Sequence, residues 1–241
     1  MPLQSATMGL LDRLTDRALA LLGLDFALDL TEVPFHRITG HLHLGGRPTE
    51  ATVPALREAG ITHVVSCLPE RLRGEVAFLE HSEAPLQTTF YDLRDGIHAD
   101  PSLHFPSFFA TMEQTRACGG QLLVHCQLGV SRSATFATAW VMRSQQLRFF
   151  EAVQLVRARR PQVLPNIGFA SQLQQLEHEL VGARTDGEPS SLARYLHEIC
   201  QVPIERGVLD EALEQHGHDA LASLTAIFGD ELPRVIQGVR R

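Results

Sequence analysis

The residues most capable of chemistry in this sequence lie in one short segment, VHCQLGVSRS at residues 124–133. Cys126 and Arg132 stand there with five residues between them. An ionised thiol is a strong nucleophile, and a planar guanidinium can bind two oxygens of a phosphate group at once. The spacing therefore indicates a site in which Cys126 attacks a phosphoryl group while Arg132 holds its oxygens.

The elements around this segment are predicted to be a strand, a loop and a helix in succession. Residues 121–125 form a short apolar run after two glycines, and residues 132–146 have the strongly apolar character of a buried helix. A loop between them directs successive backbone N–H groups inward, and the helix adds the positive end of its dipole. We expect this arrangement to bind an anion and to lower the pKa of the Cys126 thiol.

The remaining positions of the segment fit the same chemistry. Gly129 allows the backbone to approach a phosphate closely, and the hydroxyl of Ser133 can donate to the sulfur when the thiolate leaves again. A buried structural cysteine beside an unrelated arginine is the alternative, and the positions of Gly129 and Ser133 argue against it. Five uncharged loop residues are expected to face the substrate: Gln127, Leu128, Gly129, Val130 and Ser131.

With His125 before the cysteine, the segment resembles the signature His-Cys-x-x-Gly-x-x-Arg-Ser/Thr of the cysteine-dependent dual-specificity protein phosphatases, in the protein tyrosine phosphatase superfamily. The resemblance extends over about residues 38–180, through LHLG at 42–45, GITHVV at 60–65, RRP at 159–161, PN at 165–166, GF at 168–169 and QL at 172–173. It implies an α/β fold with a central mixed sheet of about four to five strands flanked by helices. It also implies hydrolysis through a phosphocysteine intermediate without a cofactor or metal, because Arg132 and the loop amides neutralise the phosphate charge.

The resemblance also implies a general acid, which protonates the leaving oxygen, from an aspartate in a loop after a strand ahead of the cysteine. Asp95 stands 31 positions before Cys126 and follows a strand predicted over residues 88–93. Asp92 falls inside that strand and Asp100 stands closer to the next helix, so both are kept as alternatives. Asp95 is our predicted acid.

Three further side chains receive supporting or competing interpretations. The resemblance implies that His125 supports the loop and the thiolate through hydrogen bonds, and that Asn166 helps to hold the loop. A simple turn role for Asn166 beside Pro165 is the alternative. His41 and His43 would share one face of a strand, but no third metal ligand is evident nearby, so we interpret them as solvated and expect no metal site.

The flanks of the site divide the chain into three predicted parts. Residues 1–35 contain an amphipathic helix over residues 8–24, which is expected to pack on the core; a membrane-surface role is the alternative. Residues 36–184 form the predicted phosphatase domain. Residues 185–241 begin with a breaker-rich linker run over 185–191 and continue as a small helical extension. The sequence predicts neither the role of this extension nor the oligomeric state.

Composition narrows the possible partners and the compartment. A formal net charge of -7 in 241 residues opposes broad binding to nucleic acid or to anionic membranes. The chain has no lysine, which excludes a Walker-type phosphate loop and Schiff-base chemistry. The cysteines are widely spaced and are predicted to be free thiols in a reducing, cytoplasmic environment, with a regulatory disulfide of Cys126 as the alternative: Cys67, Cys118, Cys126 and Cys200.

The expected substrate class follows from features that the sequence lacks. Phosphoinositide phosphatases of the same superfamily carry lysines in the loop, and this loop carries none, which argues against a polyphosphorylated lipid headgroup. Phosphotyrosine-only enzymes add a tyrosine-bearing recognition loop that deepens the pocket, and none is found before the second strand, so we expect a shallow pocket for phosphotyrosine and phosphoserine/threonine on proteins. The resemblance leaves a phospholipid monoester such as phosphatidylglycerophosphate as an alternative, because GGRP at 45–48 and the amphipathic helix are similar to the lipid-directed branch. A catalytically inactive phosphate-binding interaction protein is the alternative from another class.

Overall fold

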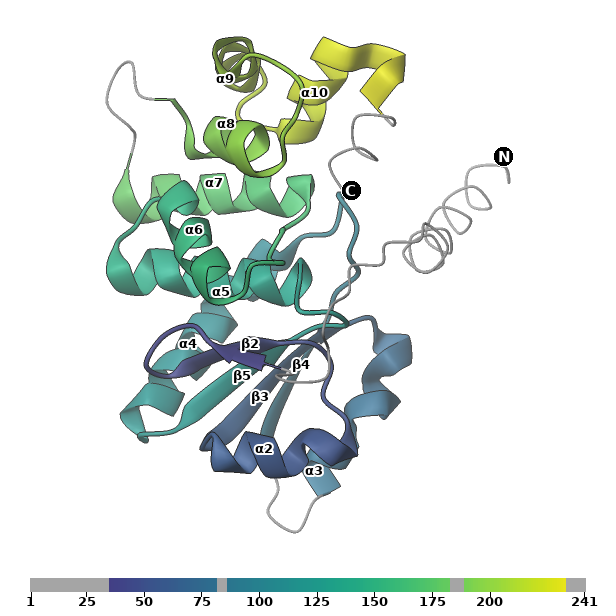
Figure 1. Cartoon of the computed structure of the whole chain (residues 1–241), viewed down its shortest axis with the longest axis vertical. Coiled ribbons are helices and arrows are strands. Elements are labelled where there is room, and N and C mark those ends of the chain that lie inside the picture. Colours follow the sequence, from purple (N-terminus) through teal and green to yellow (C-terminus); the bar gives the residue numbers. More distant parts are fainter. Residues whose placement is uncertain (1–34, 82–85, 183–188, 233–241) are drawn as a thin grey trace. The chain divides into compact units, whose positions relative to one another are not determined.

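The computed structural model describes residues 35–81, 86–182 and 189–232 (Figure 1). The helix predicted over residues 8–24 lies outside these residues. In the described part of the chain, the strands form one five-stranded sheet of order β1-β2-β5-β3-β4. Their bounds are Phe35–Arg37 for β1, Leu42–Gly45 for β2, Ile61–Leu68 for β3, Gln87–Asp92 for β4 and Gln121–His125 for β5.

Strand direction places the candidate chemistry at the carboxyl ends of the parallel strands. β1 is antiparallel to β2, whereas β2, β3, β4 and β5 run parallel to one another. The predicted mixed sheet is therefore confirmed. Because the carboxyl ends of parallel strands lie on the same side of a sheet, the loops that follow β2, β4 and β5 lie together there, including the loop that carries Cys126.

Helices cover both faces of the sheet, with α2 and α3 on one side and α4 and α5 on the other, and α6 and α7 pack on α5 (Figure 1). β3 is buried on both faces: Val64 and Leu68 pack in a cluster with α2, whereas Val65 and Cys67 pack in the larger cluster with α4 and α5. This explains why β3 reads as a continuous apolar run. The helix bounds are Val53–Glu58 for α2, Phe78–His81 for α3, Phe105–Ala117 for α4, Arg132–Gln145 for α5, Phe149–Arg159 for α6 and Ile167–Val181 for α7.

Short helical turns connect these elements. One of them, Glu70–Val76, was not predicted, and neither was α3 after it. Its sequence ERLRGEV is mostly charged and buries only Val76, so it carries no apolar periodicity from which a helix could be read. Two more 3₁₀ turns lie among these elements, Glu50–Thr52 before α2 and Pro101–His104 before α4.

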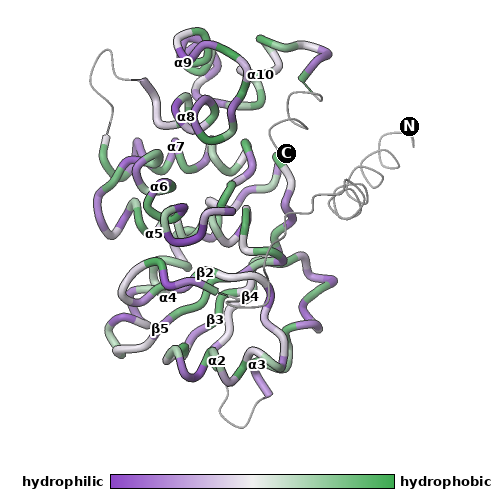
Figure 2. Tube along the Cα trace, in the orientation of Figure 1, coloured by the Kyte–Doolittle hydropathy of each residue, from purple (hydrophilic) through white to green (hydrophobic). Residues whose placement is uncertain are grey.

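The C-terminal extension consists of helices that pack on α6 and α7, as Figure 1 shows. They are α8 (Ser191–Arg194), a π-helical turn (Tyr195–Ile199), α9 (Arg206–Gln215), α10 (Ala220–Phe228) and a 3₁₀ turn (Gly229–Glu231). Hydrophobic and hydrophilic residues are interleaved along α8 and α9, as expected for helices buried on one face (Figure 2).

The buried residues of the extension belong to the same hydrophobic cluster as those of α5 to α7. The predicted linker run over residues 185–191 reaches too far, because Ser190 is the N-cap of α8 and Ser191 is its first residue, and both are buried. A boundary between residues 184 and 185 remains a prediction. No helix among the described residues is long and apolar enough to cross a bilayer.

Candidate active site

Cys126 lies directly after β5, with its side chain buried. Its Sγ accepts hydrogen bonds from the backbone N–H of Gly129 at 3.3 Å and from Oγ of Ser133 at 3.2 Å. Burial raises the pKa of the Cys126 thiol, but the charge of Arg132 and the hydrogen bonds from Ser133 outweigh it, and the net pKa is lowered. The site therefore favours the thiolate, which is the nucleophilic form.

The loop between Cys126 and Arg132 turns its carbonyl groups away from the sulfur. Because the C=O and N–H of a trans peptide point in opposite directions, this leaves the intervening N–H groups directed towards the centre of the loop. Four successive carbonyls accept hydrogen bonds from outside the loop: Gln127 from the N–H of Arg47, Leu128 and Gly129 from the guanidinium of Arg160, and Val130 from the N–H of Leu164.

Gly129 is required by both conformation and space. Its φ is +70°, a left-handed conformation that strains other residues. A Cβ at this position would lie 2.4 Å from the carbonyl oxygen of Gly45, at the end of β2. The loop can therefore pack against the end of β2 only with glycine at residue 129.

Arg160 is the residue that fixes this loop and that the sequence did not single out. Its side chain is 2 % exposed, with Nη2 donating to the carbonyl of Leu128 at 2.8 Å and Nε donating to that of Gly129 at 2.9 Å. Its Nη1 lies 3.0 Å from Nδ1 of His36, whose pKa is lowered by burial and then by Arg160. The RRP motif at 159–161 was a signal, but its spacing could not show where the guanidinium points.

Arg132 lies in the first turn of α5 and is 8 % exposed. Its Nε has no hydrogen-bond partner among the described residues, and it lies 3.7 Å from Oδ2 of Asp95. A buried guanidinium N–H without an acceptor can bind an incoming oxyanion without first breaking a protein contact. The Nε–H of Arg132 is thus free to bind an oxyanion.

Asp95 follows β4 and reaches the same place. Its Oδ1 accepts hydrogen bonds from Oγ of Ser131 at 2.7 Å and from Nδ2 of Asn166 at 2.9 Å. Its Oδ2 accepts none of these hydrogen bonds and lies on the side of Arg132. The geometry brings Asp95 and Arg132 together, as the predicted acid requires.

The loop that carries Asp95 rests on the first turns of α7. A Cβ at Gly168 would lie 2.0 Å from the carbonyl oxygen of Ile97, so the backbones meet too closely for any other residue. Nε2 of Gln172 donates to the carbonyl of Ala99 at 3.1 Å. The position of Asp95 therefore depends on how α7 begins.

The two competing aspartates are engaged elsewhere. Asp92 is the last residue of β4, and its Oδ1 accepts from the N–H of Glu70 at 2.8 Å. Asp100 caps the following 3₁₀ turn, accepting from the N–H of Ser102 at 2.9 Å. Both carboxylates stabilise local backbone, which explains their presence without a catalytic role.

A model of the dual-specificity phosphatase catalytic domain matches residues 42–179 of this chain. The chain belongs to the dual-specificity phosphatase family. The match covers β2, the loop that carries Asp95, the loop that carries Cys126 and most of α7, and it ends before the C-terminal extension.

Individual relatives agree with this family. "MAP kinase phosphatase with leucine-rich repeats protein 3" of Dictyostelium discoideum is 35% identical over 154 residues, 63% of this chain and 17% of its own length. Human "Dual specificity protein phosphatase 5" is 34% identical over 129 residues, 54% of this chain and 33% of its own length. These two matches span a third or less of each relative. The crystal structure of human DUSP28 superposes with a TM-score of 0.55 at 32% identity, covering 62% of this chain and 97% of the other.

In this phosphatase domain His125 and Asn166 both contact the predicted machinery. Nδ1 of His125 lies 3.3 Å from the carbonyl oxygen of Cys126, and its Nε2 lies 2.7 Å from Oγ of Ser66. Burial, as the largest cause, lowers the pKa of His125 to about 4, so the imidazole is neutral at neutral pH. The side chain of Asn166 makes two contacts: its Oδ1 caps α7 by accepting from the N–H of Phe169, and its Nδ2 donates to Oδ1 of Asp95. The turn interpretation and the site interpretation of Asn166 therefore both apply.

The interpretation of His41 and His43 as solvated residues is wrong for His43. Its side chain in β2 is buried, and burial followed by the charge of Arg37 lowers its pKa to about 4. His41 is partly buried before β2, with Nδ1 2.9 Å from the carbonyl oxygen of Gly120. β2 lies second from the edge of the sheet, and the ring of Phe35 on β1 packs edge-on against His43 with a centroid distance of 5.6 Å, which the alternation of residues alone did not reveal.

Proposed function

We propose that this chain hydrolyses phosphate monoesters through a phosphocysteine intermediate, with Cys126 as nucleophile, Arg132 as phosphate ligand and Asp95 as general acid. The proposal rests on one observation, the convergence of a buried thiol of lowered pKa, an unbonded guanidinium N–H and a carboxyl group at one loop. Membership of the family supports the same reaction.

In the first step the Cys126 thiolate attacks phosphorus, and an S–P bond forms as the ester P–O bond breaks. The electron pair of the broken bond stays on the leaving oxygen, which takes the proton of Asp95. Arg132 and the inward N–H groups of the loop carry the charge on the equatorial phosphoryl oxygens through the transition state.

In the second step water attacks the phosphocysteine and releases inorganic phosphate. The Asp95 carboxylate, now deprotonated, takes a proton from the attacking water. The S–P bond breaks with its electron pair on sulfur, and the Ser133 hydroxyl, 3.2 Å from Sγ, donates to the departing thiolate. Cys126 and Asp95 then return to their starting protonation states.

For the substrate class we propose phosphotyrosine and phosphoserine/threonine on proteins. The loop side chains between Cys126 and Arg132 carry no charge, which disfavours a ligand with several phosphates. Several relatives carry the name dual specificity protein phosphatase, and one is named a MAP kinase phosphatase. A phospholipid monoester is retained as the alternative in the test.

The proposal is tested by measuring phosphate release from p-nitrophenyl phosphate and from a panel of phosphopeptides, phosphoinositides and phosphatidylglycerophosphate, with chelator present in every reaction except those with vanadate, which chelators bind. We expect turnover of p-nitrophenyl phosphate and the phosphopeptides, inhibition by vanadate, and loss of turnover in Cys126→Ser of about 10⁴-fold or more. Asp95→Asn should slow poor leaving groups most, and Asp92→Asn is its matched control.

Several outcomes would count against the proposal. Turnover that survives in Cys126→Ser would exclude the phosphocysteine route. Phosphate binding without turnover of any substrate would identify an inactive phosphate-binding module. Release from the lipid alone would move the substrate class to phospholipids and leave the mechanism intact.

A further inference from the structure

The C-terminal extension contacts the active site through one peptide group. Oη of Tyr195, in the π-helical turn, donates a hydrogen bond to the carbonyl oxygen of Pro165 at 2.5 Å. The same peptide group carries the N–H of Asn166, which donates to Oγ of Ser131 at 3.1 Å. The extension therefore binds one end of a peptide whose other end binds the cysteine loop.

The two donors that hold Asp95 both depend on this peptide group. Ser131 donates to Oδ1 of Asp95 while accepting from the Asn166 N–H, and Asn166 donates to the same oxygen through Nδ2. Rotation of the Pro165–Asn166 peptide would displace the Asn166 side chain and remove a donor from Ser131. A hydrogen bond at Pro165 resists that rotation, and the bonds along the series polarise one another.

Tyr195 is itself held firmly. Its side chain is fully buried, and its ring centroid lies 5.1 Å from that of Phe149 on α6. Burial, followed by the neighbouring Cys200, raises the pKa of Tyr195, so the phenol keeps its proton and acts as a donor. The π-helical turn is closed by a hydrogen bond of 3.0 Å from the N–H of Cys200 to the carbonyl of Tyr195.

The extension is attached to α7 at other points that do not reach the acid. The N–H of Leu192 donates to Oε1 of Gln174 at 2.8 Å, and the N–H of Ala220 donates to Oγ of Ser171 at 3.0 Å. These contacts fix the extension on the first and middle turns of α7. They provide control positions at which the attachment can be weakened without removing the Tyr195 hydroxyl.

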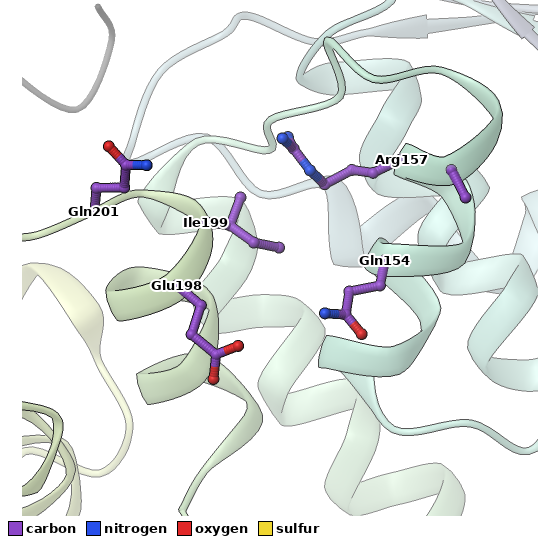
Figure 3. Close-up of a pocket in the computed structure, with 6 residues that line it drawn as sticks. Gln154, Arg157, Glu198, Ile199 and Gln201 are labelled. Atoms are coloured by element: carbon purple, nitrogen blue, oxygen red, sulfur yellow. The ribbon is translucent and has the colours of Figure 1, made fainter.

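The loop that carries Pro165 is also held from α6. The π-helical turn and α6 face each other across an open pocket, into which Arg157 extends from α6 (Figure 3). The guanidinium of Arg157 donates to the carbonyl of Val163, whereas the hydroxyl of Tyr195 donates to that of Pro165. Only the Tyr195 contact is made to the peptide group that orients Ser131. The pocket is lined by Gln154, Arg157, Ala158, Glu198, Ile199 and Gln201.

We propose that Tyr195 is a positioning residue for the general acid, acting on Asp95 through the Pro165–Asn166 peptide, so that the extension beyond the family domain completes the active site. The inference rests on the proposed function, because it gives Asp95 the task of protonating the leaving oxygen. It assigns a positioning role to a residue outside the 42–179 match.

Tyr195→Phe removes the hydroxyl and keeps the ring. Loss of one buried hydrogen bond corresponds to about a 3- to 10-fold change in rate if its whole effect falls on the acid. We expect kcat/KM to fall by about this factor for phenyl phosphate, whose leaving group needs the proton, and by less than about twofold for 6,8-difluoro-4-methylumbelliferyl phosphate, whose leaving group does not.

The experiment compares these two substrates in wild type, Tyr195→Phe, Asp95→Asn and the double variant. The ratio of the two kcat/KM values does not depend on the fraction of folded enzyme, so partial unfolding cannot imitate the effect. In the double variant the ratio should equal that of Asp95→Asn alone, because the hydroxyl acts only through the acid. Tyr91→Phe, the other tyrosine, loses a hydroxyl that contacts Ser107 on α4, and Ser171→Ala weakens the attachment of the extension. Both controls should keep the wild-type ratio.

An unchanged ratio in Tyr195→Phe would overturn the proposal, as would a further change of the ratio when Tyr195→Phe is added to Asp95→Asn. An equal fall for both substrates would show that Tyr195 only stabilises the fold. Loss of turnover in Cys126→Ser is measured in parallel. If that loss is absent, the proposed function itself fails, whatever the tyrosine variants show.

Discussion

Replacing Arg160 by methionine should make Cys126 a weaker acid, although the two side chains have no direct contact. Nη2 of Arg160 holds the carbonyl of Leu128, and the N–H of the same peptide group is that of Gly129, which donates to Sγ of Cys126. Without the guanidinium this peptide can rotate, and its N–H is lost to the thiolate. Methionine keeps similar length and apolar contacts but removes both the hydrogen bonds and the charge of Arg160, which also acts on Cys126. Arg160→Lys keeps the charge and so separates the two effects.

The size of the effect follows from the bonds involved. A hydrogen bond to a charged group contributes about 1.5–3 kcal/mol, so losing the Gly129 N–H from the thiolate should raise the pKa of Cys126 by about one to two units. At a pH below the thiol pKa of both the wild type and the variant, kcat/KM should fall by about 10- to 100-fold, in proportion to the fraction of Cys126 that is ionised. Arg160→Lys should also raise the pKa of Cys126, by most of the same amount, because an ammonium cannot hold two carbonyls in a fixed plane.

The assay is the pH dependence of inactivation by iodoacetamide, followed as loss of activity, so that the other cysteines do not contribute. Inhibition by vanadate measures the phosphate site independently. Arg159→Met is the matched control, because Arg159 is its exposed neighbour at the end of α6. If folded Arg160→Met keeps the wild-type thiol pKa and vanadate affinity, the loop does not depend on the guanidinium and our reasoning is wrong.

Two further predictions concern stability. Glu177 is buried and accepts hydrogen bonds from Nη1 of Arg148 and from the N–H of Phe149. Glu177→Ala should therefore lower the free energy of unfolding, measured in urea, by about 3 kcal/mol, and Glu177→Gln by about half as much. Equal urea midpoints for the two variants would contradict this. His125 has a folded pKa of about 4 against an ordinary 6.5, so the unfolded state takes up the proton first and stability falls as the pH drops from 6.5 to 4, by up to about 3 kcal/mol. His125→Asn should show a shallower fall over that window, and an identical pH profile would count against the assignment.

Local sequence signals predicted the elements that carry the site. The two glycines before β5, the apolar run and the apolar helix after the loop were enough to place Cys126 between β5 and α5, with α5 ending one residue earlier than expected. Asp95 was placed after β4 for the same reason, because strand and breaker signals are local. These predictions needed no information on which strands pair.

The contacts that fix the site were not predictable from one sequence. Arg160 binds carbonyls 31 and 32 residues away, and Tyr195 binds one 30 residues away. Each depends on how helices pack in three dimensions, and neither residue type has a pattern that indicates its partner. An arginine at a helix end and a tyrosine in an apolar helix are ordinary by composition, and only the fold gives them a role.

The outward carbonyls of the cysteine loop have a consequence for when the nucleophile first exists. The segments that bind them come from the turn after β2, at Arg47, and from the end of α6 and the turn that follows it, at Arg160 and Leu164. The first lies far before the cysteine loop in the chain and the other two lie after α5. A fragment ending after α5 would contain the whole signature and still have an ordinary, weakly reactive thiol. Reactivity at Cys126 should therefore appear late, together with the docking of α6, and a nascent or misfolded chain should be spared the alkylation and oxidation to which the mature enzyme is exposed.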